Sequence, residues 1–204
     1  MFRNLTTVVV LLVLVCISFG ATAQDFEIYK GDTINLTDKQ GRKQGKWIIF
    51  NSEQSRIIEQ GYYEDNRKQG LWKKYYANGN LQSEITYQNG SPKGKTKIYY
   101  RNGNLSEEGY WEDDHWRGEY RFYHKNGQEA YIWHYNEDGK RTGTQKYFYA
   151  DGSLKVEGTW DDGKKDGVIK KYYDNGSLKS QIAYNKGQIK EGSRKKYNKK
   201  KANR

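Results

Sequence analysis

The sequence predicts an all-β protein, built as an elongated single-layer array of about six antiparallel β-hairpin repeats of 24–25 residues. Three observations predict this fold. A glycine recurs every 24 or 25 residues, each glycine is followed by the same order of aromatic residues and turns, and no stretch has the periodicity and caps of a helix. The glycines that open the units are Gly45, Gly70, Gly94, Gly118, Gly143 and Gly167.

The composition favours a thin, aromatic-rich fold over a thick aliphatic core. Only 34% of the 204 residues are hydrophobic and the mean hydropathy is -1.15, which taken alone would suggest disorder. However, 15% of the residues are aromatic, including 19 tyrosines. Tyr and Trp bury large areas while they keep a polar tip in water. The length suits one domain or one short repeat array.

Residues 1–23 have the pattern of a secretory signal peptide. Arg3 precedes the apolar run 8–17, and Ala21 and Ala23 place small residues where signal peptidase reads them. The run is shorter than the roughly 20 residues that span a bilayer. We therefore expect cleavage after Ala23 and an exported protein that is periplasmic, envelope-associated or secreted. Cys16, the one cysteine, lies in this run, so the mature chain is expected to have no disulfide and no thiolate metal site.

Residues 24–38 show no repeat, and we expect them to form a short strand that caps the array, because arrays need atypical end units. The array spans residues 39–192. In its clearest unit, Asn78-Gly79 predicts a two-residue type I′ turn. This turn would pair Tyr76 with Leu81, Lys74 with Ser83 and Trp72 with Ile85. Since side chains alternate along a strand, Tyr75 would lie on one face and a larger set on the other: Trp72, Tyr76, Leu81, Ile85 and Tyr87.

Aromatic residues recur at fixed places in the unit, so both faces of the sheet are expected to carry rings that stack one hairpin on the next. Five residues after the opening glycine stand Phe50, Tyr75, Tyr99, Tyr123, Phe148 and Tyr172. The second strand ends on Tyr63, Tyr87, Trp111, Tyr135, Trp160 and Tyr184.

Two repeats depart from the pattern. In the first, residues 51–55 replace the tight turn. In the fourth, His124 takes a tyrosine position and Glu129 a leucine position, with Trp133 nearby. A tuned site and ordinary drift between repeats both account for this, and we favour drift because no other polar groups converge there.

The unit resembles the variant MORN repeats of bacterial proteins often labelled YwqK-type antitoxins. The shared pattern is Gly-x-Trp, then Tyr-Tyr, Asn-Gly, a leucine and a closing aromatic residue, as in residues 70–87 and again in 171–178. The resemblance covers about residues 39–192. It implies a single-layer hairpin array used for interaction or tethering, and the antitoxin label implies no defined biochemistry. The tryptophan of the pattern is replaced in four repeats, by Thr96, Tyr120, Gln145 and Ile169.

The sequence predicts a protein that is not an enzyme and that has no cofactor or metal. No nucleophile motif, phosphate loop or metal motif is present in the sequence. His124 is expected to face Glu129 rather than His134, and zinc needs three or four converging ligands. The acidic turns at 112–114 and 161–163 lack the alternating Asp spacing of a calcium loop.

The net charge of +11 is distributed unevenly. Residues 193–204 carry seven Lys or Arg and no acid, and the rest is close to balance, so nucleic acid is not an expected partner. The tail either attracts anionic lipid or glycan or is a solvated segment that blunts the last edge strand. Tyr197 keeps the spacing of the array, which also suits a truncated repeat. The basic residues of interest are Arg194, Lys195, Lys196, Lys199, Lys200 and Lys201.

Taken together, these features favour an exported interaction scaffold that binds a protein or a component of the cell envelope. The alternative is a glycan- or cell-wall-binding module, since exposed Trp and Tyr stack on sugars or hold cations. An antitoxin-like role follows from the family label only. The identity of the ligand and the oligomeric state stay open. The candidate binding residues are Tyr75, Tyr99, Trp111, Tyr123, His124 and Trp133.

Overall fold

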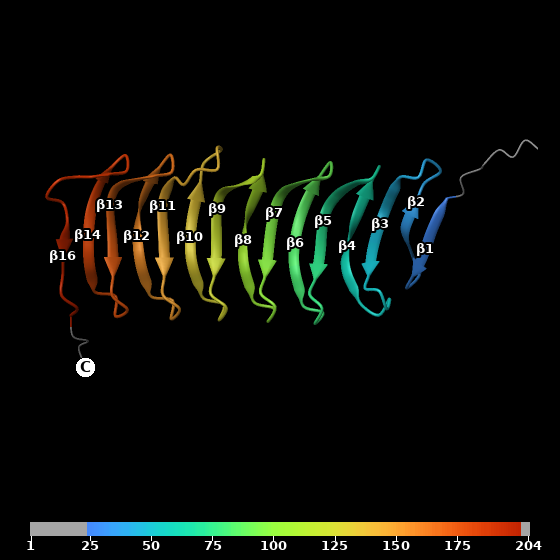
Figure 1. Cartoon of the computed structure of the whole chain (residues 1–204), viewed down its shortest axis with the longest axis horizontal. Coiled ribbons are helices and arrows are strands. Elements are labelled where there is room, and N and C mark those ends of the chain that lie inside the picture. The colour runs from blue at the N-terminus through green and yellow to red at the C-terminus, as the bar shows by residue number, and fades with distance from the viewer. Residues whose placement is uncertain (1–23, 201–204) are drawn as a thin grey trace, which may run out of the picture.

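The computed structural model describes residues 24–200, which form one open sheet of 16 antiparallel strands. Hydrogen-bonded neighbours follow chain order from β1 to β15, and β16 pairs with β14. Figure 1 shows one elongated row of strands with no second layer over this part of the chain. Within these residues there is no helix long and apolar enough to cross a membrane. The predicted signal peptide and Lys201 lie outside the described residues.

The predicted fold class is confirmed, because six consecutive hairpins make up the body of the sheet. These hairpins are β3–β4 (Lys43–Phe50, Ile57–Glu64), β5–β6 (Arg67–Tyr75, Leu81–Gln88), β7–β8 (Ser91–Tyr99, Leu105–Glu112), β9–β10 (His115–Tyr123, Glu129–Tyr135), β11–β12 (Gly143–Phe148, Leu154–Asp161) and β13–β14 (Lys164–Tyr172, Leu178–Asn185). The ends are β1 (Asp25–Tyr29), β2 (Asp32–Thr37), β15 (Gln188–Ile189) and β16 (Lys195–Lys196).

Residues 24–38 form a hairpin rather than the single capping strand expected. Lys30 and Gly31, both with positive φ, make the tight turn between β1 and β2. Asn35 Oδ1 accepts a hydrogen bond of 2.8 Å from the backbone N–H of Ile48 in β3, so a side chain satisfies an edge donor that β2 leaves unpaired. Ile34 and Ile48 are buried at this junction. The hairpin therefore closes the first repeat by packing as well as by strand pairing.

The register divides the strand residues of the array between two faces. Trp72 pairs with Ile85 and Lys74 with Ser83, as predicted. We call the face that carries Trp72 and Ile85 Face A, and the opposite face, which carries Tyr75, Face B. Leu81, however, pairs with Tyr75 rather than with Tyr76, because the ladder has a bulge between Lys74 and Tyr75. The prediction that Leu81 lies on the face of Trp72 is therefore wrong.

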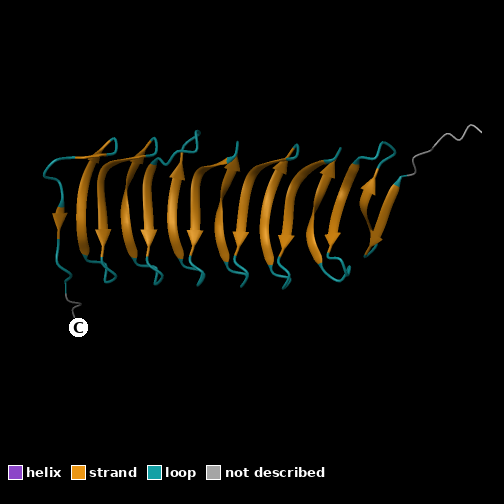
Figure 2. Ribbon diagram, in the orientation of Figure 1, coloured by secondary structure: helices purple, strands orange, loops and turns teal. Residues whose placement is uncertain are grey.

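The turns at the two ends of the strands, drawn as teal loops in Figure 2, are of different types. In the Asn-Gly turn only the glycine has positive φ (Gly79, 87°). The backbone N–H of Tyr76 donates to Asn80 O, and that of Gly79 donates to Tyr76 O. This is a three-residue loop closed by a left-handed glycine, not the type I′ turn predicted. Two consecutive positive φ values occur instead at the linking turns, at 65–66, 89–90, 113–114, 162–163 and 186–187.

Beyond the buried Ile34 and Ile48 at the N-terminal junction, the main row of buried residues follows Face A, and it has a period of two repeats. Residues two positions after the opening glycine are buried in repeats two to six: Trp72, Thr96, Tyr120, Gln145 and Ile169. A Cβ on Gly61 would lie 2.3 Å from the Trp72 ring, and one on Gly158 would lie 2.2 Å from Ile169. Gly109 meets Trp116 in the same way, at 2.9 Å. The odd repeats thus supply a bare backbone on which a large side chain of the following even repeat packs.

Candidate functional site

From the second repeat onward, one column of side chains joins each repeat to the segment that follows it. The hydroxyl of Tyr76 donates to the backbone carbonyl of Tyr99 at 2.7 Å, and Tyr100 donates to Tyr123 O at 2.6 Å. Tyr149 and Tyr173 make the same bond to Tyr172 and Tyr197. His124 takes this role in the fourth repeat, with Nε2 placed 3.3 Å from the carbonyl of Phe148. The geometry therefore assigns His124 a place in the repeat, although Glu129 pairs with Tyr123 and not with His124 as expected.

The asparagine of each Asn-Gly turn also bridges two repeats, which explains its recurrence better than backbone conformation does. Asn78 Nδ2 donates to Arg101 O at 2.9 Å, and Asn102 donates to Lys125 O at 3.1 Å. Asn126 and Asn175 make the equivalent bonds to Ala150 and Lys200. Asp151 interrupts this ladder, since a carboxylate has no N–H to donate. Its Oδ1 instead accepts from the backbone and the hydroxyl of Ser153.

Replacing Asp151 by asparagine is therefore expected to add the missing bond, from the new amide to the carbonyl of Asp174, and to raise the free energy of unfolding by about 1 kcal/mol. Chemical denaturation measures this. The reverse change, Asn102→Asp, removes an existing bond and is the matched control, with a decrease of about the same size. Equal stability of Asp151→Asn and the natural chain would contradict the assignment.

On Face B, the four tyrosines that follow an opening glycine by five residues each form a hydrogen bond to the preceding repeat. Tyr99 donates to Glu84 at 2.7 Å, and Tyr172 donates to Glu157 at 2.6 Å. Tyr123 donates to Glu108 at 2.5 Å, whereas Tyr75 accepts from Gln60. Burial and the hydrogen bond to Glu157 raise the pKa of Tyr172 to about 12. Burial, followed by the bond to a glutamate, also raises the pKa of Tyr99 and Tyr123.

These raised pKa values predict a loss of stability in alkali. The folded state favours the neutral phenol, so its contribution is complete below the unfolded pKa of about 10. It is lost as the pH rises through about 12, the pKa of Tyr172. The free energy of unfolding should fall over this pH range, and ultraviolet absorbance measures the formation of tyrosinate in the same samples. Tyr99→Phe combined with Tyr123→Phe should flatten the dependence, and an unchanged slope would count against these two phenols.

Face B also carries one cross-strand row in which cations and carboxylates alternate, except that Ile132 takes one carboxylate position. The row runs Lys73, Glu84, Lys97, Glu108, Arg121, Ile132, Lys146, Glu157 and Lys170, each paired with the next in the ladder. Lys73 and Glu84 are 3.2 Å apart, and Lys170 and Glu157 are 3.5 Å apart. Charge on this face is therefore largely matched within the sheet.

Face A carries a continuous cluster of rings around the fourth repeat. Trp111 and Trp116 meet edge to face with centroids 5.0 Å apart, and Trp133 stacks on Tyr131 at the same distance. The cluster comprises Trp111, Trp116, Tyr120, Phe122, Tyr131, Trp133, Tyr135 and Tyr147. Apart from the buried Tyr120, these rings are half-buried, since no second layer of the described chain covers them.

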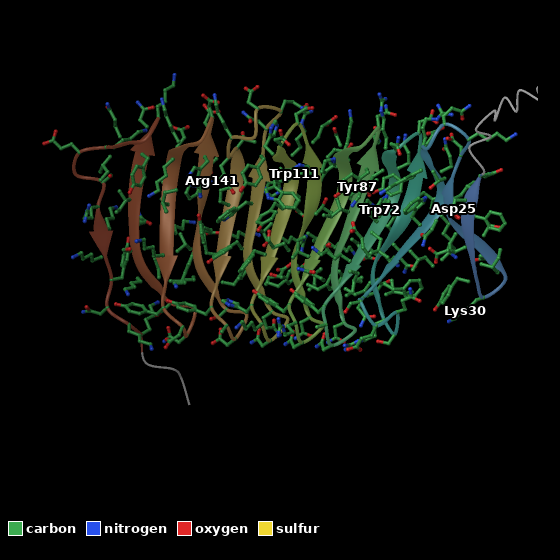
Figure 3. The ribbon with its side chains drawn as sticks, turned by 45° about the vertical axis from the view of Figure 1, so that its right-hand side comes forward. Asp25, Lys30, Trp72, Tyr87, Trp111 and Arg141 are labelled. Atoms are coloured by element: carbon green, nitrogen blue, oxygen red, sulfur yellow. The ribbon has the colours of Figure 1, made fainter. Side chains whose placement is uncertain are left out.

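A second feature of Face A escaped the sequence reasoning. In four repeats the residue two positions before the opening glycine is a cation whose charge lies over the rings: Lys43, Lys68, Arg141 and Lys165. Lys68 Nζ is 4.1 Å from the Trp72 ring centroid and 5.2 Å from that of Tyr87. Figure 3 shows Trp72, Tyr87, Trp111 and Arg141 following one another along the sheet. The sequence signal for this feature was a basic residue two positions before the opening glycine in four of the repeats.

The predicted candidate residues do not form one site. Tyr75, Tyr99 and Tyr123 lie on Face B with their hydroxyls engaged by the preceding repeat. Trp111 and Trp133 lie within the ring cluster of Face A. Among residues 24–200, no three His, Cys, Asp or Glu side chains are grouped so as to hold a metal ion.

The described part of the basic tail continues the array as half a repeat. Lys195 and Lys196 pair with Gln181 and Ser180, and Tyr197 accepts the bond from Tyr173 that joins other repeats. Lys200 O receives the amide of Asn175. Lys199 pairs with Asp174. Up to Lys200, the backbone of this segment is thus held against the sixth repeat, which supports the truncated-repeat interpretation.

Comparison with known proteins supports the repeat assignment. The family model described as MORN repeat variant matches residues 68–89, 92–113, 141–162 and 165–186. These segments correspond to the second, third, fifth and sixth repeats, and each begins two residues before the opening glycine. The first and fourth repeats, which depart most from the pattern, lie outside them. No curated protein matches the chain.

Proposed function

We propose that this chain, four of whose repeats are MORN repeat variants, is an exported, non-enzymatic scaffold that binds a protein of the cell envelope along Face A. The observation that carries the proposal is the uncovered row of aromatic rings on that face. Aromatic residues are enriched at the centres of protein interfaces because they offer large contact area at little entropic cost. A repeat array extends such a surface over many strands.

The proposal is tested by capture from envelope fractions with the tagged mature chain. The change Phe122→Ala with Tyr131→Ala removes two half-buried rings from Face A and should abolish saturable binding of the captured protein. Tyr62→Ala with Tyr110→Ala is the matched control, because these rings are 56% and 40% exposed on Face B. Equal loss with both pairs, or loss with neither, would overturn the choice of face.

Export rests on the sequence pattern of residues 1–23 and has a separate test. The mass of the chain recovered from the periplasmic or secreted fraction should correspond to a protein that begins at Gln24. Recovery of the unprocessed chain from the cytoplasm would contradict it. Neither outcome bears on which face binds.

A glycan site is the second candidate, and a hollow on Face B favours it. This hollow of about 430 Å3 lies beside the exposed Tyr110 and is bordered by Lys95, Glu108 and Arg121. A sugar stacked on the tyrosine would have both hydrogen-bond donors and acceptors within reach. Glycan-array binding that Tyr110→Ala removes would support this candidate, and an array without signal would exclude it for the glycans present.

A further inference from the structure

The charges of the array are segregated between its two faces, although the overall charge outside the tail is close to balance. On Face A the acidic strand residues from β3 to β16 are Glu59 and Glu107. Glu59 is paired with Lys68, and Glu107 accepts a bond of 3.0 Å from Tyr120. The basic residues on this face are Lys43, Lys68, Lys74, Arg141, Lys165, Lys171 and Lys196.

From this segregation we infer that the partner bound on Face A is an acidic polypeptide segment that also carries apolar side chains. The inference rests on the proposed function and specifies its partner. Lys43 and Lys165 have no carboxylate partner within residues 24–200 and lie against rings, at 4.6 Å from Trp47 and 5.1 Å from Tyr184. A carboxylate would meet Lys43 in a partly buried setting, where charge pairs count for more than in water, and would meet Lys165 in an exposed one.

The same geometry argues against partners that stack on aromatic rings. Bases and sugars need the face of a ring, and the faces of Trp47, Trp72 and Trp160 already have a cation over them. At these three tryptophans, ring edges and the aliphatic stems of the basic residues suit leucine or isoleucine side chains. A hollow of about 460 Å3 beside Trp72, bordered by Lys68 and Lys74, gives such side chains a place.

A flat anionic membrane fits this face less well than a polypeptide does. Four of the seven cations, Lys43, Lys68, Arg141 and Lys165, lie over rings, and Lys68 Nζ is 4.1 Å from the Trp72 centroid. A peptide chain can follow the hollow and bring carboxylates down to the ammonium groups, whereas a lipid surface meets projecting groups first.

The test uses the mature chain and a fluorescent peptide in which leucine and glutamate alternate, followed by anisotropy. We expect binding that weakens as salt is added, and about tenfold weaker binding for Lys43→Glu combined with Lys165→Glu. The matched control is Lys95→Glu combined with Lys146→Glu, two exposed Face B lysines that form no ion pair in the described chain, which should leave affinity unchanged. A leucine–lysine peptide should not bind.

Other outcomes overturn the inference. The inference is contradicted if the peptide does not bind, or if both lysine pairs cause the same loss of affinity. It is also contradicted if phosphatidylglycerol vesicles or single-stranded DNA bind through Face A in place of the peptide. If the envelope protein is captured through Phe122 and Tyr131 but ignores the reversal of Lys43 and Lys165, the proposed function stands and the acidic partner does not. If no Face A change weakens either capture of the envelope protein or binding of the peptide, both the proposed function and the acidic partner are contradicted.

Discussion

Replacing Trp72 by alanine is expected to lower the free energy of unfolding by about 3–5 kcal/mol, the range for a large buried aromatic residue. Trp72 is 2% exposed, its ring lies on the backbone of Gly61, and it meets Tyr63 edge to face with centroids 4.9 Å apart. Its indole N–H donates to Tyr62 O at 3.0 Å, so the change also leaves a carbonyl without that partner. Because no second layer of the described chain covers the sheet, no other described side chain fills the space.

Chemical denaturation of variants at two neighbouring positions, Trp72 and Leu71, compares the contributions of the two faces to stability. Leu71→Ala is the matched control, because Leu71 is 47% exposed on Face B, and an exposed site should change stability by about 0.5 kcal/mol or less. Similar losses for both variants would show that Face A is not the core of the array.

Adding one methyl group at Gly61 should destabilise the protein by about 1–3 kcal/mol through overpacking. Gly61→Ala would place its Cβ 2.3 Å from two carbons of the Trp72 ring. The cause is space rather than backbone conformation, because Gly61 is not among the glycines with positive φ. Gly70 is the opposite case: its φ is +64° and a Cβ there would meet nothing within 4 Å.

A double-mutant cycle separates the clash from any other effect of the methyl group. In the Trp72→Ala background the ring is gone, so Gly61→Ala should cost little or even restore some packing. The measurement is the difference between the two free energies for Gly61→Ala, obtained by denaturation with and without the tryptophan. Equal costs in both backgrounds would show that the methyl group does not act through Trp72.

Spacing alone was enough to predict the fold, because a repeat fixes strand order once one hairpin is identified. The pairings of Trp72 with Ile85 and of Lys74 with Ser83 were predicted correctly, since both lie away from the turn. The turn itself was not. Asn-Gly suits a type I′ turn on conformational grounds, but Asn78 is retained here as a donor to Arg101 of the next repeat. Contacts between repeats cannot be read from the hairpin that contains the residue.

The candidate site was predicted less well for a similar reason. The division of Trp72 and Tyr75 between opposite faces was predicted correctly, but the place of Leu81 depends on the bulge next to Tyr75, and bulges leave no clear mark in a single sequence. The fourth repeat looked irregular because of His124, which the structure shows making the inter-repeat bond of its tyrosine counterparts. The basic residue two positions before four of the opening glycines was present in the sequence, but its position over the rings emerges only once the register is known.

The alternation along Face A constrains how such a protein changes length during evolution. In the natural array Ile85 pairs with the smaller Thr96. Removing the third and fourth repeats together would place Gln145 beside Ile85 in the position of Thr96. Removing the third repeat alone would set Ile85 against Tyr120, two large side chains where the natural array puts a large one beside a small one. Gene duplication or deletion should therefore be tolerated in steps of two repeats, and descendants of this chain should differ by whole pairs. The heritable module is the pair of hairpins, even though the repeated motif is one.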